Sequence, residues 1–332
     1  MPDFRALIDN GSAHLFDGAL GTELYQRGVF INVSYDELNL KRPEIVREVH
    51  RAYRDAGAEI IETNTFGANR FRLGQHGLGD KTHEINRAGA ALAREVAGDD
   101  LYVAGSIGPL GARVEPYGPT ALEEARELFR EQAAALAEGG ADVLIVETFS
   151  DLSEVEQAVL GCRQAAELPV IAHMTVYTDG NTVYGYDPAR IARHLEDVGA
   201  DVIGLNCSVG PAIILKAIQK MAEVTDLPLS AMPNAGLPRE IEGRKIYLAS
   251  PDYFAKYTRR LIQAGVRFVG GCCGTTPAHT QAMAAQVRAL RPQRHGVVVE
   301  KVRDVERRET APGVEPVPTS RRSQLAGKIT AG

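Results

Sequence analysis

The sequence lacks the features that mark membrane, secreted and nucleic-acid-binding proteins. No apolar run approaches the roughly 20 residues that a helix needs to cross a bilayer. The first residues show no charged head followed by an apolar core, so we predict no secretion signal and a cytoplasmic protein. The net charge of −6 leaves no basic excess, which argues against nucleic acid as the main partner.

Cysteine and aromatic side chains are also scarce. The 332 residues include no Trp and only four cysteines, Cys162, Cys207, Cys272 and Cys273. In a reducing compartment, cysteines serve more often as buried, catalytic or metal-binding residues than as disulfides. The four thiols are therefore expected to be free, although two of them, Cys272 and Cys273, are adjacent in the sequence.

What the sequence has instead is a regular alternation of short apolar runs and amphipathic segments. The runs are continuous rather than alternating in polarity, which is typical of strands in a parallel sheet covered on both faces. Eight runs are predicted to be strands: residues 14–17, 59–62, 102–106, 142–147, 170–175, 201–206, 229–233 and 267–271. Apolar residues at three and four spacing predict helices between them, for example over residues 44–56, 120–138, 153–167 and 252–264.

One local pattern recurs at four junctions between a helix and the next strand. The segments DAGAEI, EGGADV, DVGADV and QAGVRF each place a glycine where a left-handed residue would end the helix. These glycines are Gly57, Gly140, Gly199 and Gly265. A unit repeated eight times predicts a single-domain (β/α)8 TIM barrel over residues 1–290. An open doubly wound sheet is the alternative, but no Gly-x-Gly-x-x-Gly follows the first strand.

The chain changes character after residue 290. Residues 291–332 are rich in charge and proline and carry little core pattern, so we predict a linker tail. Residues 320–332 have the pattern of a helix start. We interpret the chain as one domain of a longer protein, with a further domain after the linker.

Unusual residues cluster where the predicted strands end, which in a (β/α)8 barrel is where the site is built. Cys207 follows the sixth strand, and Cys272 and Cys273 follow the eighth strand between glycines. Three thiolates that meet at one point suit zinc, and three protein ligands leave a fourth position open, as in catalytic zinc sites. Adjacent strand residues point to opposite faces, so the two neighbouring cysteines can share a metal only if the backbone twists, which glycines permit.

Other interpretations fit the same residues. A cysteine is often a small buried hydrophobe, which is the role we expect for Cys162 on its helix. The glycine-rich loop before residues 275–277 could cradle a phosphate, or the Cys-Cys pair could be redox-active without metal. Asp17 and Glu147 could be structural acids, and His173 is interpreted as a packed residue rather than a ligand.

Five motifs together resemble the homocysteine S-methyltransferase family of zinc barrels. They are DGALGT at residues 17–22, ETNTF at 62–66, GLNC at 204–207, PNAGLP at 233–238 and GGCCG at 270–274. The resemblance covers about residues 10 to 290, with the motifs in the family's order. It implies a (β/α)8 barrel that converts homocysteine to methionine.

The resemblance also implies a role for individual residues. Cys207, Cys272 and Cys273 would be zinc ligands and in that sense catalytic residues. The homocysteine thiol would take the open position as a thiolate, because zinc lowers the pKa of a bound thiol. The implied substrate contacts are Glu147 and Asp17 for the ammonium group, Gly18, Ala19 and Ser106 for the carboxylate, and Asn206 beside the first cysteine.

The sequence narrows the choice of methyl donor. Betaine enzymes of the family enclose the trimethylammonium group with aromatic side chains. This sequence has no Trp, and it has Gly67 and Thr148 where the betaine type has tyrosines. The donors that remain are S-methylmethionine, methylcobalamin and a folate-derived methyl group.

The end of the chain resembles one subgroup of the family. The segment PVPTSRRSQLAGKITAG is similar to the junction in bacterial bifunctional proteins, in which a methylenetetrahydrofolate reductase domain follows the methyltransferase domain. The resemblance implies such a reductase domain as a partner. The alternatives are the homocysteine domain of a cobalamin-dependent methionine synthase, a methyltransferase for another thiol or a selenol, and a non-catalytic module of a bifunctional protein.

Overall fold

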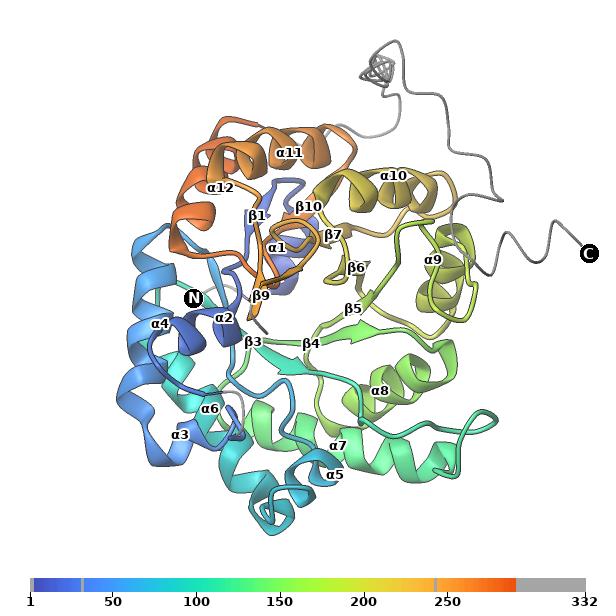
Figure 1. The fold of residues 1–332 in the computed structure, drawn as a ribbon. Helices are drawn as coiled ribbons and strands as arrows, with labels where there is room; N and C mark the ends of the chain where they lie inside the picture. The colour runs from blue at the N-terminus through green and yellow to red at the C-terminus, as the bar shows by residue number, and fades with distance from the viewer. Residues whose placement is uncertain (1–2, 31–32, 242–243, 291–332) are drawn as a thin grey trace, which may run out of the picture. The chain divides into compact units, whose positions relative to one another are not determined.

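Eight parallel strands form the central sheet of the protein, as seen in a computed structural model that describes residues 3–30, 33–241 and 244–290. The strands follow one another in the order β1-β10-β7-β6-β5-β4-β3-β2. The two outer strands also meet, because Phe16 pairs with Ile60 and the amide of Glu59 donates to the carbonyl of Leu15 at 2.8 Å. The sheet therefore closes into the predicted barrel, which helices surround in Figure 1.

Each of the eight predicted strands is present. They are β1 (His14–Leu15), β2 (Ile60–Glu62), β3 (Tyr102–Ile107), β4 (Val143–Phe149), β5 (Val170–Met174), β6 (Val202–Asn206), β7 (Leu229–Met232) and β10 (Val266–Val269). Nearly all of their residues are buried, because side chains fill the barrel on one face and helices cover the other. This double burial explains why the sequence shows continuous apolar runs instead of alternation.

The predicted helices are present with ends shifted by one or two residues. They correspond to α4 (Pro43–Asp55), α7 (Leu122–Glu138), α8 (Leu152–Ala165) and α11 (Pro251–Gln263). The other helices are α1 (Arg5–Asp9), α2 (Leu20–Gln26), α3 (Leu38–Lys41), α5 (Arg70–Gly74), α6 (Thr82–Ala97), α9 (Pro188–Asp197), α10 (Pro211–Ala222) and α12 (Pro277–Ala289), with a 3-10 turn at η1 (Gly79–Lys81). None of the helices in the described residues has the length and apolar character needed to cross a membrane.

The connection between β7 and α11 contains a hairpin that the sequence did not reveal. Its strands β8 (Arg239–Ile241) and β9 (Arg244–Ile246) pair antiparallel. Both are three residues long and contain charged residues, so neither produces an apolar run. The predicted linker, residues 291–332, lies outside the residues that the structure describes.

The repeated junctions are built as the sequence pattern indicates. The four predicted cap glycines all have positive φ angles: Gly57 98°, Gly140 100°, Gly199 84° and Gly265 96°. Two junctions add an aspartate that ties the new strand to its neighbour. Asp142 accepts the amide of Val103 at 2.7 Å, and Asp201 accepts the amide of Val170 at 2.7 Å. Each bond satisfies a backbone group where two strands begin side by side.

The amino-terminal end of the barrel is closed by the segment around α1. Phe4 is 1% exposed, and its ring centroid lies 5.3 Å from that of Tyr102 and 5.8 Å from that of Phe268. Arg5 reaches the carboxylate of Asp201 at 3.5 Å. This aromatic plug leaves the carboxyl ends of the strands as the place where a ligand can approach the interior.

The junction bonds predict a measurable contribution to stability. Asp201→Ala removes the acceptor of Val170 and the partner of Arg163, so the free energy of unfolding should fall by about 1–3 kcal/mol. Urea unfolding followed by circular dichroism measures the change. Asp197→Ala is the control, because Asp197 is exposed at the end of α9 and its loss should cost less than about 0.5 kcal/mol. Equal losses in the two variants would contradict this role.

Candidate metal and substrate site

Three of the four cysteines meet at the carboxyl end of the barrel. The Sγ atoms of Cys207, Cys272 and Cys273 all lie within 4.8 Å of one another, and those of Cys207 and Cys273 are 3.8 Å apart. Ligand sulfurs on a tetrahedral zinc are about 3.8 Å apart when each bond is about 2.3 Å long. All three residues are partly exposed, so the cluster faces the mouth of the barrel. The donor set therefore fits a metal ion with one position left for a ligand.

The backbone beyond β6 and β10 directs the sulfurs toward one point. The amide of Cys207 donates to the carbonyl of Met232 at 3.0 Å, and the amide of Cys272 donates to that of Pro233 at 2.9 Å. The carbonyl of Cys273 accepts the amide of Ala235 at 2.9 Å. The segment after β7 thus lies between the two cysteine loops and holds both. Because the neighbouring cysteines lie past the end of β10, they escape the alternation of a regular strand.

Strained backbone occurs at this same mouth. Among the described residues, the non-glycine residues with positive φ are Thr148 at 68°, Cys207 at 58° and Ser208 at 58°. Such a conformation costs on the order of 1–3 kcal/mol per residue and persists only where its surroundings hold it. Asn206 holds the backbone of Thr148 in this conformation, because its Oδ1 accepts the amide of Thr148 at 2.8 Å.

The sulfur cluster is electrostatically unbalanced without a cation. Hydrogen bonds from Cys207 and Cys272 lower the pKa of Cys273 to about 3. The same contacts and burial raise the pKa of Cys272 well above its ordinary value. One thiolate is thus stabilised by two thiols, and three adjacent thiolates would repel one another. A bound dication would allow all three to ionise.

Two other residues of interest have no place in the cluster. Cys162 is fully buried in α8, where burial raises the pKa of its thiol to about 12, in keeping with a structural role. His173 on β5 is also fully buried, and burial lowers its pKa to about 3, so its ring is neutral. It is not part of the metal-ligand group found among the described residues.

Glu147, near the end of β4, is an acid of the mouth whose carboxylate is held by two side-chain hydrogen bonds. It is 6% exposed, and its Oε1 accepts the hydroxyl of Ser106 at 2.6 Å while its Oε2 accepts Nδ2 of Asn206 at 2.8 Å. Burial raises the pKa of Glu147 to about 7, against the lowering effect of these hydrogen bonds. Ser106 and Asn206 were predicted as substrate contacts, and in this structure both orient the carboxylate.

Two further acids lie in the same charged group. Asp17 follows β1 and is 1% exposed, and its Oδ2 accepts the amide of Glu62 at 3.0 Å. Asp17 Oδ1 and Glu62 Oε1 are buried and have no hydrogen-bond partner among the described residues. Burial raises the pKa of both groups, and the charge of Glu147 raises it further. The sequence analysis did not assign Glu62 to the site, although its position at a strand end in the ETNTF motif was a usable signal.

The backbone predicted to receive a carboxylate is partly engaged by the protein itself. The amide of Ala19 donates to Thr275 Oγ1 at 3.0 Å, and that hydroxyl donates to the carbonyl of Cys272 at 2.7 Å. A Cβ on Gly18 would lie 2.8 Å from Thr275 Oγ1 and 2.9 Å from the ring of Tyr53. Glycine at this position therefore allows β1 and the cysteine loop to approach closely.

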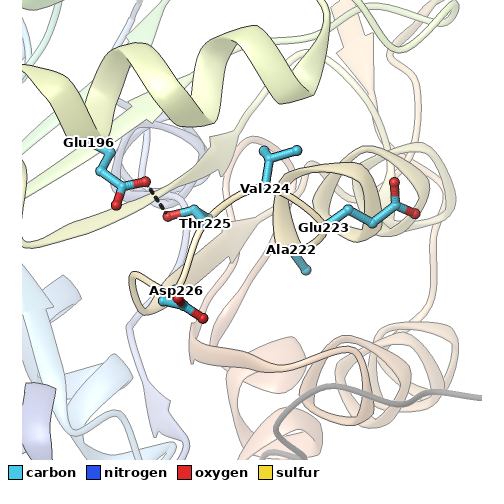
Figure 2. A pocket seen from close by; sticks show the side chains of 6 residues that line it. All are labelled: Glu196, Ala222, Glu223, Val224, Thr225 and Asp226. Atoms are coloured by element: carbon cyan, nitrogen blue, oxygen red, sulfur yellow. Dashed lines mark hydrogen bonds between the residues drawn. The ribbon is translucent and has the colours of Figure 1, made fainter.

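A surface hollow elsewhere is unrelated to this mouth. Figure 2 shows it at the end of α10, where the hydroxyl of Thr225 donates to Glu196 at 2.8 Å. Its lining comes from the last turns of α9 and α10 and from the loop that leads into β7. It therefore lies at the amino-terminal end of the strands, opposite the cysteines.

A family model described as "Homocysteine S-methyltransferase" matches residues 14–287. The match covers all eight strands of the barrel and every residue of the mouth described above. The chain belongs to the homocysteine S-methyltransferase family. The predicted family and the predicted enzyme class, a methyltransferase, are thereby confirmed.

Named relatives agree with this placement. Methionine synthase of Mycobacterium tuberculosis is 38% identical over 300 residues, which are 84% of this chain and 25% of that protein. The methionine synthase of Mycobacterium leprae is 38% identical over 292 residues, or 82% of this chain and 24% of that protein. The chain thus spans about a quarter of the length of these relatives.

A solved protein structure that matches this chain over nearly its whole length has the same barrel. The metallated form of the homocysteine methyltransferase MmuM from Escherichia coli is 27% identical, with a TM-score of 0.73 over 85% of this chain and 99% of that one. The oxidized form of the same protein gives a TM-score of 0.74 over 86% and 100% of the two chains.

The sulfur geometry predicts metal binding that depends on each cysteine of the cluster. Cys273→Ser should lose the bound metal while the barrel stays folded, because the cluster lies at the rim and outside the core. Zinc per chain after reductive purification and zinc reloading measures this, with circular dichroism as the folding check. Cys162→Ala is the control and should retain about one zinc, like the unmodified chain. Full zinc retention by Cys273→Ser would contradict the ligand assignment.

Proposed function

We propose that this chain transfers a methyl group to the sulfur of homocysteine at a zinc ion held by Cys207, Cys272 and Cys273. The observation that carries the proposal is the approach of the three sulfurs to within 4.8 Å at the mouth of the barrel. Zinc lowers the pKa of a bound thiol and so supplies a thiolate nucleophile at neutral pH. Family membership supports homocysteine as the thiol. Three thiols kept reduced also favour the cytoplasm as the location.

The chain's own residues would bind and orient the amino acid. Glu147 presents a buried carboxylate fixed by Ser106 and Asn206, and Asp17 adds a buried oxygen without a partner among the described residues. A substrate ammonium group between them would satisfy these acceptors and offset the cost of their burial. Because Asn206 precedes Cys207 in the chain, the orientation of the acid is linked to that of a sulfur ligand.

The assignment of the ammonium site predicts a selective kinetic effect. Glu147→Gln should raise the KM for homocysteine about tenfold to a hundredfold, because one charge-assisted hydrogen bond is lost. Zinc content should stay unchanged. Glu154→Gln is the matched control: Glu154 on α8 is also buried, but its carboxylate accepts the amide of Leu110 and not the side chains that hold Glu147. Loss of zinc together with substrate binding would instead make Glu147 part of the metal site.

We further propose that a folate- or cobalamin-derived methyl group is brought to the mouth by another part of a longer polypeptide. The methionine synthase relatives support this arrangement, because the match to this chain accounts for only about a quarter of their length. The distribution of exposed apolar side chains supports it too. Within the described part of the chain, eleven large apolar side chains are exposed, and all lie between a strand's carboxyl end and the first turn of the long helix that follows: Tyr25, Phe30, Val33, Phe71, Tyr117, Tyr177, Val183, Leu237, Ile246, Leu248 and Tyr253. Apolar residues gathered on one face are typical of an interaction surface.

We propose two candidates for the part of the polypeptide that brings the methyl donor, both from the sequence. The likeness of residues 316–332 to a bifunctional junction supports a methylenetetrahydrofolate reductase domain. The 38% identity to methionine synthases supports folate and cobalamin modules instead. The coding sequence downstream of residue 332 distinguishes the two.

A panel of free donors tests the proposal about the donor. The zinc-loaded chain and homocysteine receive methylcobalamin, methyltetrahydrofolate or S-methylmethionine, and methionine is measured. We expect transfer from methylcobalamin to exceed that from S-methylmethionine. The exposed apolar face suits a large donor that docks on the mouth, whereas a small sulfonium donor would not need such a face. Rapid turnover with S-methylmethionine would overturn the proposal of a carried donor. Absence of transfer from every donor would favour the non-catalytic alternative.

A further inference from the structure

Two segments of the mouth that serve different parts of the proposed site are bonded to each other. The segment after β1, residues 17–22, contains the predicted contacts to the amino-acid group of the substrate. The cysteine loop, residues 270–275, contains two of the three sulfurs. The amide of Gly271 donates to the carbonyl of Asp17 at 3.1 Å, so the two segments are in direct contact where they leave their strands.

Thr275 provides the side-chain link between these segments. Its side chain is 0% exposed, and its Oγ1 accepts the amide of Ala19 at 3.0 Å and donates to the carbonyl of Cys272 at 2.7 Å. A hydroxyl carries one proton, so the contact with Ala19 must be the accepting one and the contact with Cys272 the donating one. Valine has nearly the same shape as threonine but can form neither bond.

The surroundings of the Thr275 hydroxyl leave it little freedom to move. A Cβ on Gly18 would lie 2.8 Å from Oγ1, and a Cβ on Gly271 would lie 2.5 Å from the same atom, so both segments approach it with glycine. The hydroxyl of the buried Tyr53 lies 3.2 Å from the carbonyl oxygen of Ala19 and 3.3 Å from that of Thr275. The spacing of the two segments therefore depends on the Thr275 side chain.

We propose that Thr275 is a positioning residue that fixes the distance between the amino-acid site and the metal, so that a thiol of the length of homocysteine reaches both. The inference rests on the proposed function. A ligand held at both ends gains affinity when its two sites are already correctly spaced, because the second contact is then intramolecular. If the link is lost, part of the binding free energy is used to order the two segments instead.

Thr275→Val tests the proposal on the chain loaded with cobalt(II), whose sulfur-to-metal charge-transfer absorption increases when a thiol binds the metal. The affinity for homocysteine should fall about tenfold, because the buried amide of Ala19 loses its acceptor and the two segments separate. The affinity for β-mercaptoethanol, which reaches only the metal, should stay unchanged. Cysteine is one methylene shorter and cannot span both sites, so the preference for homocysteine over cysteine should also fall about tenfold.

Three further variants separate the link from general damage. Thr275→Ser keeps the hydroxyl and should bind homocysteine like the unmodified chain. Thr280→Val is the matched control, because Thr280 on α12 is also 0% exposed but its Oγ1 has no hydrogen-bond partner among the described residues. It should leave every affinity unchanged. Thr22→Val removes the acceptor of the Gly274 amide, a second bond between the same segments, at a half-buried position. It should weaken homocysteine binding in the same direction, and it carries the test if Thr275→Val does not fold.

The outcomes distinguish this inference from the proposed function. Unchanged homocysteine binding in a folded Thr275→Val chain would overturn the role of Thr275 and leave the metal site standing. Equal weakening of homocysteine and β-mercaptoethanol would also overturn it, because the hydroxyl would then serve the metal loop alone. If the unmodified chain takes up cobalt but does not prefer homocysteine to β-mercaptoethanol, the proposed function itself fails and the inference falls with it.

Discussion

The crowding of three cysteine sulfurs is the constraint on which the mouth of this barrel depends. Thiolates within 4.8 Å of one another repel strongly, so they ionise together only around a cation. The backbone accepts strain to bring them there, with Cys207 at a positive φ and Gly274 in a turn closed to other residues. A metal ion would relieve the repulsion and offer a fourth position. The strain and the unbalanced charge both fit the proposed function, in which a thiol substrate would complete the metal site.

The buried acids form a second group of negatively charged side chains in the mouth, beside the sulfurs. Glu147, Asp17 and Glu62 occupy the ends of three strands, and burial raises the pKa of each. In the proposed function, an amino acid with a thiol would satisfy both halves of the mouth, since its ammonium group would pair with the acids while its sulfur would reach the metal. Asn206 connects the halves, because it donates to Glu147 and directly precedes Cys207. The proposed arrangement would select an amino-acid thiol over a simple thiol.

The sequence predicts the barrel and the cysteine cluster well because both depend on local signals. Continuous apolar runs mark strands covered on two faces, and glycine marks each junction. The contacts within the mouth depend on tertiary structure, and pattern alone did not supply them. The hydroxyl of Ser106 donates to Glu147 and the amide of Ala19 donates to Thr275, two contacts across the barrel that no sequence pattern indicated.

The most direct test of the account is the number of sulfur ligands on zinc, measured by X-ray absorption at the zinc edge. The zinc-loaded chain is compared with and without homocysteine. The account predicts three sulfur ligands in the free protein, from the three clustered cysteines, and four when homocysteine is bound. An unchanged sulfur count on adding saturating homocysteine would contradict it, because the substrate thiol would then react without occupying the metal.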